Sequence, residues 1–459
     1  MDLELLAALR TPAGVDALAA ATAVSGGDPL AAAMALRAQG VDPSLAAAAL
    51  TQSDLRRRAA GKFGAAAARM FFTRAGLEQA TRSVVANRRA ARLRAAGVAT
   101  LADLGCGLGA DALAAARQGI VVYAVEADPL TAALAAANVA AAGLASLVTV
   151  ECADATTVEV AGFDAVFADP ARRRAGRGRV MDPRSWSPPW DFIASLPDRV
   201  PKTVLKLAPG IDHALLPAGA EGEWVSVDGD LVEAAFWCGP LATAARRATL
   251  LSTTTLPSPL TTPPSSPTTP TSSHPTAPSS HPTLPSSRPT ASSPLTAAAS
   301  SPSAFPNLSA GAGLPATAEE GRVFELTGSG FELAPVGSVG AYLYDPDPAV
   351  VRSHLVAEFA ATIDGRLADP DIAYVHSDSF FETPFARALT VTDVLPFSLK
   401  RLRALLRDRG IGRLEIRKRG SALEPDQLRK DLRLSGPNGA SLVLTKVAGA
   451  PTAILCAPY

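Results

Sequence analysis

The sequence predicts an α/β protein whose central part is an open parallel β-sheet with helices on both faces. Short apolar runs alternate with helical stretches between Ala99 and Ala208, which is the pattern of repeated β-α-β units. A purely helical pattern precedes this part, and a tract rich in Ser, Thr and Pro separates it from a second, mixed part. We expect five segments: an N-terminal helical region (1–78), the parallel-sheet domain (79–251), a disordered linker (252–317), a hairpin connection (318–344) and a small C-terminal α+β domain (345–459).

The N-terminal region carries apolar residues at intervals of three to four, the spacing of one buried helix face. Gly-Gly-Asp-Pro and Gly-Val-Asp-Pro interrupt this spacing and mark turns. The expected helices are Asp2–Leu9, Gly14–Ala23, Pro29–Gln39, Pro43–Leu50 and a longer, arginine-rich one at Gln79–Ala95.

The central part supplies strands and helices in alternation. The expected strands are Thr100–Leu104, Val121–Glu126, Val148–Glu151, Ala165–Ala168 and Val204–Ala208, with helices at Ala110–Gln118 and Leu130–Ala142. Three further apolar runs predict an antiparallel end to the same sheet, at Glu223–Val227, Val232–Cys238 and Arg247–Leu251.

The tract from Ser252 to Thr317 contains almost only Ser, Thr, Pro and Ala. It has too few apolar side chains to offset chain entropy, so we expect disorder. After it, Arg322–Leu326 and Ala341–Tyr344 indicate a hairpin. The remaining expected elements are helices Ala349–Ile363, Leu399–Arg409 and Pro425–Leu432 and strands Ile372–His376, Ala388–Val394, Arg413–Arg417, Ser441–Val447 and Thr452–Ala457.

The strongest motif is Asp103-Leu-Gly-Cys-Gly-Leu-Gly109, which directly follows the first expected strand and opens a helix. Its glycines, Gly105, Gly107 and Gly109, let the backbone approach a ligand closely, and the helix presents its positive end. Dinucleotide enzymes and methyltransferases share such a turn. The G-x-G-x-G spacing after an acid, and Glu126 at the end of the second strand, favour a methyltransferase.

Together with Asp154 and Asp169-Pro-Ala-Arg172, these residues resemble the motifs of class I S-adenosylmethionine-dependent methyltransferases. The resemblance implies a Rossmann-like fold with S-adenosylmethionine as the cofactor. It further implies that Asp103 and the glycines line the methionine part of the cofactor. Glu126 would then contact the ribose, and Asp154 the adenine amino group.

Asp169-Pro-Ala-Arg172 ends the fourth strand and is similar to the D/N-P-P-aromatic motif of enzymes that methylate amino groups on bases. An exocyclic amine is a poor nucleophile, because its lone pair is delocalised into the ring. Asp169 would accept one N–H and the Pro170 carbonyl the other, which aims the lone pair at the sulfonium methyl group. Arg172 stands where the family has an aromatic residue, and it suits either stacking on a base or holding a phosphate.

Two further groups of residues are expected on the substrate side. Phe72, Thr73 and Gln79 belong to a helical lead-in similar to that of trimethylguanosine synthase-like enzymes, which closes over cofactor and substrate; burial of the phenylalanine in the core is the alternative. Five arginines in eight residues, followed by a tryptophan, suit a loop that tracks phosphates beside a stacking platform. The members of this loop are Arg172, Arg173, Arg174, Arg177, Arg179 and Trp186.

Two segments are strongly basic: residues 55–95 hold eleven Lys or Arg against one Glu, and residues 395–446 hold thirteen against five acids. The second resembles the THUMP-like domain appended to some methyltransferases, and THUMP domains imply RNA binding, often of tRNA. The candidate RNA contacts are Arg417, Lys418 and Arg419. A domain that only packs on the enzyme and stabilises it is the alternative.

The composition limits the function further. Lys and Arg (43) balance Asp and Glu (43), no apolar run predicts a membrane span, and no secretory leader is expected. Four scattered cysteines without a CxxC pair predict neither a zinc site nor disulfides, so we expect no metal and a cytoplasmic protein. The expected function is methylation of a base nitrogen in tRNA or rRNA. The alternatives are a methyltransferase acting on a small molecule or protein, and a non-catalytic RNA-binding protein that keeps the fold.

Overall fold

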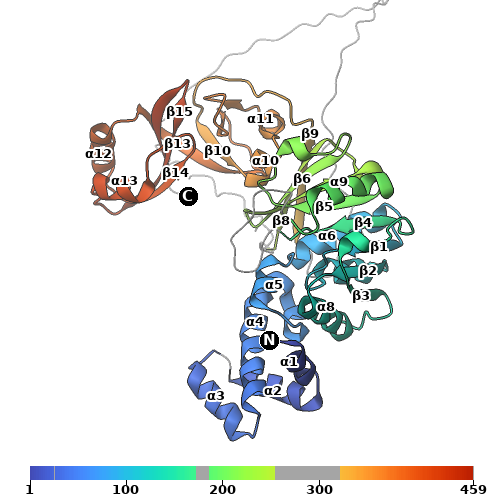
Figure 1. The fold of residues 1–459 in the computed structure, drawn as a ribbon. Helices are drawn as coiled ribbons and strands as arrows, with labels where there is room; N and C mark the ends of the chain where they lie inside the picture. The colour runs from blue at the N-terminus through green and yellow to red at the C-terminus, as the bar shows by residue number, and fades with distance from the viewer. Residues whose placement is uncertain (25, 172–185, 254–320, 458–459) are drawn as a thin grey trace, which may run out of the picture. The chain divides into compact units, whose positions relative to one another are not determined.

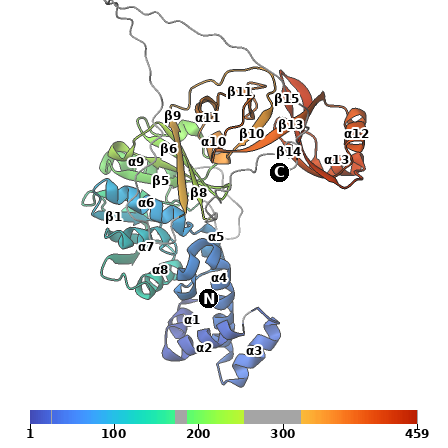
Figure 2. The same ribbon diagram turned by 180° about the vertical axis from the view of Figure 1, so that it is seen from behind.

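The computed structural model describes residues 1–24, 26–171, 186–253 and 321–457 (Figures 1 and 2). These residues belong to one compact unit that spans 1–254 and 321–459. Most of the expected arginine loop and nearly all of the expected linker lie outside the described residues. None of the helices in the described ranges is long and apolar enough to cross a membrane.

The described part before the first strand is helical, as expected. Its elements are α1 (Leu3–Leu9), α2 (Pro12–Ala23), α3 (Pro29–Ala38), α4 (Pro43–Phe63), η1 (Gly64–Arg69), α5 (Arg74–Gln79) and α6 (Ser83–Ala95). Helices α1, α3 and α4 begin within one residue of the predicted start, whereas α2 begins two residues before the predicted Gly14. An Asp or Thr side chain accepts a backbone N–H at each of these four starts. Helix α4 continues past the expected end at Leu50, because Leu55, Ala59 and Phe63 keep the apolar spacing and are buried.

The single helix expected over Gln79–Ala95 is wrong, because the chain leaves helical geometry between α5 and α6. The Nζ of Lys62 donates to the carbonyls of Leu77 (2.7 Å), Glu78 (3.0 Å) and Ala80 (3.1 Å). These contacts satisfy carbonyl groups at the end of α5 that would otherwise accept from a continuing helix. The Lys62 side chain, which belongs to α4, therefore fixes where α5 ends.

The first sheet has the order β3-β2-β1-β4-β5-β7-β6-β8-β9. Its strands are β1 (Thr100–Leu104), β2 (Val121–Glu126), β3 (Val148–Cys152), β4 (Ala165–Ala168), β5 (Thr203–Leu207), β6 (Glu221–Val227), β7 (Asp230–Trp237), β8 (Arg246–Ser252) and β9 (Arg322–Gly328). The first five are parallel, and β7 is antiparallel to both β5 and β6, which confirms the expected Rossmann-like sheet with an antiparallel end. Helices α7 (Ala110–Arg117), α8 (Pro129–Ala141) and α9 (Trp190–Arg199) pack against the parallel strands (Figure 1).

The hairpin expected within residues 318–344 is wrong. Strand β9 instead pairs antiparallel with β8 and completes the first sheet. Arg247 Nη1 on β8 donates to Glu325 Oε2 on β9 at 2.5 Å, so an ion pair reinforces this edge. The other half of the expected hairpin, β10 (Tyr342–Pro346), belongs to the second sheet. The apolar alternation identified both strands, but it carried no information about their partners.

The second sheet has the order β11-β12-β10-β13-β16-β15-β14. The new strands are β11 (Arg366–Leu367), β12 (Val375–Ser377), β13 (Ala386–Pro396), β14 (Ile411–Lys418), β15 (Asn438–Val447) and β16 (Ala450–Cys456). One helix expected over Ala349–Ile363 is two, α10 (Pro348–Arg352) and α11 (Val356–Thr362), because His354 has a φ of 63° between them. Helices α12 (Leu399–Asp408) and α13 (Pro425–Leu432) confirm the sequence prediction and bury a leucine core against this sheet.

The core of the first sheet extends into the C-terminal part. Tyr344 on β10 and Phe359 on α11 are buried in the same apolar cluster as Trp224 on β6 and Phe236 on β7. The boundary expected at residue 345 therefore does not separate two independent cores.

Candidate cofactor and substrate site

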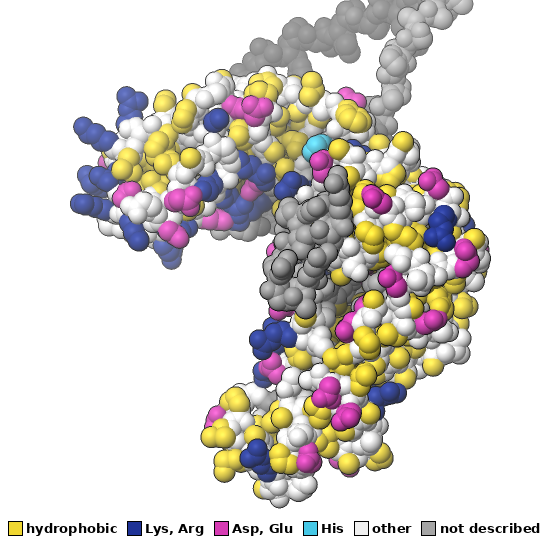
Figure 3. Space-filling view, viewed as in Figure 1, with side chains coloured by type: hydrophobic (Ala, Val, Ile, Leu, Met, Phe, Trp, Pro, Cys, Tyr) yellow, Lys and Arg dark blue, Asp and Glu magenta, His cyan; other side chains and the backbone are white. Residues whose placement is uncertain are grey.

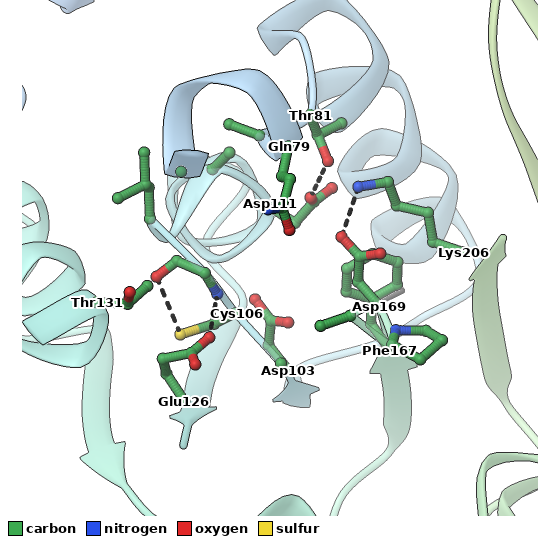
Figure 4. A pocket seen from close by; sticks show the side chains of 18 of the residues that line it. Gln79, Thr81, Asp103, Cys106, Asp111, Glu126, Thr131, Phe167, Asp169 and Lys206 are labelled. Carbon is green, nitrogen blue, oxygen red and sulfur yellow. Dashed lines mark hydrogen bonds and ion pairs between the residues drawn. The ribbon is translucent and has the colours of Figure 1, made fainter. Parts of the chain in front are cut away.

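A cavity of about 470 Å³ lies at the edge where β1, β2, β4 and β5 end (Figure 4). Open parallel sheets bind their ligands at this edge. The cavity is lined by most of the residues predicted to hold the cofactor: Asp103, Gly105, Gly107, Glu126 and Asp154. The structure thus brings together side chains from three strand ends that are separated in the sequence.

The glycine loop is fastened to its neighbours. The amides of Gly105 and Cys106 both donate to the carbonyl of Val125 at 2.9 Å. Gly105 has a φ of 89°, and a Cβ at this position would lie 2.8 Å from the carbonyl oxygen of Asp169. Only glycine allows this approach. Gly109 does not line the cavity; it adopts a left-handed conformation at the start of α7 and turns the chain into that helix.

Asp103 is fully buried, and neither of its carboxylate oxygens has a hydrogen-bond partner among the described residues. Burial, together with the negative charges of Asp111 and Asp169, raises its pKa well above the ordinary value. A buried carboxylate without a partner is costly. Because Asp103 lines the cavity, a cation bound there would offset this cost, which fits the ammonium group of the methionine part of S-adenosylmethionine.

Glu126 and Asp154 are already oriented by the backbone. Glu126 Oε2 accepts from the amide of Gly107 and Oε1 from that of Asp128, both at 3.0 Å. Asp154 Oδ1 accepts from the amide and hydroxyl of Thr156 at 2.9 and 2.8 Å. These hydrogen bonds lower the pKa of Asp154. Both carboxylates are held at the cavity with acceptor capacity left for hydroxyl or amino groups of a ligand.

The lead-in helices contribute only in part. Thr73 and Gln79 line the cavity, as predicted, but Phe72 does not. Phe72 is fully buried, its ring lies 5.6 Å from that of Phe63, and its backbone exchanges two hydrogen bonds with the side chain of Gln52. The expectation that Phe72 contacts substrate is therefore corrected: its apolar ring is part of the core.

Asp169 lies at the end of β4, and Pro170 and Ala171 follow it along the cavity wall. Its Oδ2 accepts from Lys206 Nζ at 2.5 Å (Figure 4). Burial by itself lowers the pKa of Lys206, but the negative charges of Asp169, Glu233 and Asp111 outweigh it and raise that pKa. Lys206 is thus a buried cation that neutralises the predicted amine acceptor.

Of the predicted phosphate-tracking loop and its stacking platform, only Trp186 lies within the described residues. Arg172, Arg173, Arg174, Arg177 and Arg179 lie outside the described residues. Trp186 is described and buried, with its ring edge-to-face with Trp190 at 6.1 Å. It is therefore a core residue and not an exposed stacking platform. Ser187 and Pro188 line the cavity in its place, and Ala171 and Ser187 exchange two backbone hydrogen bonds.

A buried ionic network behind the cavity was not predicted. Arg89 pairs with both Asp111 and Glu233, and its guanidinium lies 4.6 Å from the ring centroid of Phe167. Thr81 Oγ1 donates to Asp111 at 2.7 Å (Figure 4). The sequence contained one signal for such pairing, the arginine row on α6, which was interpreted as a basic surface.

The predicted RNA contacts of the C-terminal part are paired with acids. Arg417 donates to Asp345 at 2.6 Å and to Glu415 at 2.8 Å, and Arg419 donates to Asp345 at 2.8 Å. Lys418 donates to Glu424 at 2.9 Å. These contacts support a structural role for the three residues, because their charges are neutralised within the chain.

Other basic side chains of the same part are exposed. Figure 3 shows Lys and Arg gathered over α12 and α13. We define the α12–α13 basic surface as the exposed residues with no ion pair among the described ones: Lys400, Arg401, Arg407, Arg413, Lys430 and Arg433.

Three segments of the chain match known families. Residues 102–171 match the family described as "Methyltransferase domain", residues 386–458 match "THUMP domain-like", and residues 2–59 match a domain of unknown function, DUF8688. An uncharacterized S-adenosylmethionine-dependent methyltransferase of Mycobacterium tuberculosis H37Rv, Rv3037c, is 29% identical over 421 residues, which cover 88% of this chain and 95% of the relative. The corresponding protein of strain CDC 1551, MT3122, matches equally.

A solved structure has the same fold over the whole chain. It is a protein of Porphyromonas gingivalis W83 that is provisionally named a methyltransferase, with a TM-score of 0.62 and 18% identity, covering 99% of this chain and 98% of the other. The chain therefore has a segment similar to methyltransferase domains, residues 102–171, and a C-terminal segment similar to THUMP-like domains, residues 386–458.

Proposed function

We propose that this methyltransferase transfers a methyl group to a base nitrogen in RNA, either tRNA or rRNA. One observation carries the proposal: Asp169 and Pro170 line the same cavity as the glycine loop. An acceptor group beside the cofactor loop is what the methylation of an amine requires.

The cofactor supplies an electrophilic methyl group on a sulfonium. In this proposal Asp103 holds its ammonium group, Glu126 its ribose hydroxyls and Asp154 its adenine amino group. All three carboxylates line one cavity, and Asp103 has no competing partner among the described residues. The loop and the strand ends therefore fix the cofactor before the substrate arrives, which lowers the entropic cost of reaction.

The substrate amine would lie between Asp169 and the Pro170 carbonyl. Asp169 Oδ1 makes no hydrogen bond within the described part of the chain, so it is available to accept an N–H. The nitrogen must lose one proton as it gains the methyl group, and Asp169 or water accepts it. In this proposal Thr73 and Gln79, which line the same cavity, contact the base.

RNA as the substrate is supported by the α12–α13 basic surface and by the match to the THUMP-like family. Exposed Lys and Arg side chains bind phosphates regardless of base sequence. The arginine loop 172–179 is a second candidate for phosphate contact, and it lies outside the described residues.

Mass spectrometry of nucleosides from total RNA, with and without the gene, tests the proposal. A methylated nucleoside that is absent only from the deletion strain, and that returns with wild type but not with Asp169→Ala, supports it. The matched control is Asp164→Ala, since Asp164 caps the start of β1 outside the cavity. Identical nucleoside profiles, or no RNA affinity at low salt, would favour a small molecule or protein as the substrate.

A further inference from the structure

Lys206 and Asp169 meet because of the register of two strands. Ala168 on β4 lies beside Leu205 on β5 in the parallel ladder, and Asp169 and Lys206 are the next residues along each strand. The Lys206 side chain is 11% exposed, and its Nζ lies 2.5 Å from Asp169 Oδ2. The pair is therefore built into the sheet and does not depend on a mobile surface side chain.

Asp169 lies in an acidic environment. Asp103 on β1, Asp111 on α7 and Glu233 on β7 line the same cavity. Four cations lie near these acids among the described residues: Lys206 on β5, Arg89 on α6, and Lys62 and Arg82 on the cavity wall. Lys62 donates to backbone carbonyls, and Arg82 pairs with Asp230. Arg89 is committed to Asp111 and Glu233, which leaves Lys206 as the cation in direct contact with Asp169 among the described residues.

The substrate amine needs an acceptor in a fixed place, because the lone pair of its nitrogen must point at the sulfonium methyl group. The terminal torsion of an Asp side chain is broad, so an unsupported carboxylate has no single orientation. The buried ammonium of Lys206 contacts one oxygen of Asp169 and fixes the carboxylate, which leaves the other oxygen for the substrate.

We propose that Lys206 is a positioning residue for methyl transfer: it holds Oδ2 of Asp169 and thereby directs Oδ1 of Asp169 toward the substrate nitrogen. This inference rests on the proposed function, in which Asp169 accepts an N–H of the substrate. Lys206 itself touches neither reacting atom.

The test compares Lys206→Met and Lys206→Arg with wild type. Methyl transfer from radiolabelled S-adenosylmethionine to total RNA from a deletion strain is measured at one fixed pH over a range of RNA concentrations, which gives kcat and KM separately. Calorimetry with S-adenosylhomocysteine reports cofactor binding independently. The control is Lys202→Met, because Lys202 immediately precedes β5 at its opposite end and donates to the Ala96 carbonyl at 2.9 Å, outside the cavity.

For Lys206→Met we expect kcat to fall by at least about tenfold while the KM for RNA changes little, because the acceptor loses its alignment but the RNA contacts stay. Lys206→Arg keeps a charged donor for Oδ2 of Asp169 and should recover most of the lost rate. The affinity for S-adenosylhomocysteine should change little in either variant.

Two results would overturn the inference: a wild-type kcat in Lys206→Met, or a loss of activity that lies entirely in KM. If Lys206→Met does not fold, a kcat of Lys206→Arg that is at least about tenfold below wild type overturns the inference, and a kcat near that of wild type supports it. The proposed function is contradicted by different results: wild type methylates no RNA, or Asp169→Ala is fully active. Either result also contradicts the inference about Lys206, because it rests on that function.

Discussion

Arg92 donates from its two terminal nitrogens to the two carboxylate oxygens of Glu221, each at 2.7 Å. Arg247 Nε adds a bond to Glu221 at 2.8 Å. Burial alone would raise the pKa of Glu221, but these two arginines outweigh it and lower the pKa to about 2. Arg88 and Arg89, on the same helix as Arg92, also pair with buried acids. Arg88, Arg89 and Arg92 therefore hold α6 against the sheet and are not available to RNA, whereas Arg94 on the same helix is exposed.

Glu221→Gln should destabilise the protein by about 3–5 kcal/mol at pH 7, because it leaves two buried guanidinium groups without their charge partner. Since the folded pKa is lowered, this contribution is present above the ordinary value of 4.5 and is lost as the pH falls toward about 2. The difference in free energy of unfolding between Glu221→Gln and wild type should therefore become smaller as the pH falls from 4.5 toward about 2. Urea denaturation measures both effects.

The control for this prediction is Glu159→Gln, whose side chain is 79% exposed and lies 3.5 Å from Arg199. It should change stability by less than about 0.5 kcal/mol. Equal stabilities of wild type and Glu221→Gln at pH 7 would show that the buried pair contributes nothing.

Asp103→Asn should weaken binding of S-adenosylhomocysteine by about 10- to 100-fold, because a hydrogen bond to a charged ammonium is lost. It should not destabilise the apoprotein, since the buried carboxylate has no partner to lose. Calorimetry and thermal melting separate the two effects. Asp164→Asn, the matched change at the opposite edge of the sheet, should leave the affinity unaltered. Undiminished affinity in Asp103→Asn would remove Asp103 from the cofactor site.

Lys400→Ala/Arg407→Ala should lower RNA affinity and reduce the slope of log affinity against log salt by about two, one for each lost phosphate contact. Both residues are exposed on α12. The control is Arg10→Ala/Arg37→Ala, an equal loss of charge on exposed positions of the N-terminal region. Filter binding at several salt concentrations measures the slope. The same loss in both double variants would mean that only net charge matters.

Lys62→Met should loosen α5, because three carbonyls at the end of this helix lose their donor. Hydrogen exchange should show protection factors over residues 74–80 reduced by about tenfold. Burial, followed by the charges of Arg82 and Lys206, lowers the pKa of Lys62 to about 8. Wild type should therefore lose part of this protection between pH 7 and 9, whereas Lys62→Arg, which stays charged, should not.

Lys202→Met is again the control, and it should leave the exchange of residues 74–80 unchanged. Full protection in Lys62→Met would show that α5 is held by its own packing alone.

Sequence patterns located most elements but not their limits or partners. The starts of α1, α3 and α4 were predictable because each depends on a capping residue next to the helix, as Asp42 caps α4. The break between α5 and α6 was not, since its cause is Lys62, which lies on another helix. Strand β9 was recognised as a strand, but its pairing with β8 depends on residues that precede the linker.

The sequence by itself determined the cofactor end of the cavity. Asp103, Glu126, Asp154 and Asp169 all stand at or just after strand ends, and parallel strands bring such positions to one edge of a sheet. The sequence is sufficient for this inference for two reasons. The apolar periodicity shows where each strand ends, and the alternation of strands and helices makes the strands parallel, so that their carboxyl ends share one edge.

Only the tertiary structure decided which charged and aromatic residues are available at a surface. Arg89, Arg92 and Arg417 look like exposed basic residues in the sequence, yet each is neutralised by an acid on another element. Phe72 and Trp186 were expected at the substrate side, but both rings are buried against other side chains. The free energy of burying a side chain depends on the partners that the fold places around it, and those partners are distant in the sequence.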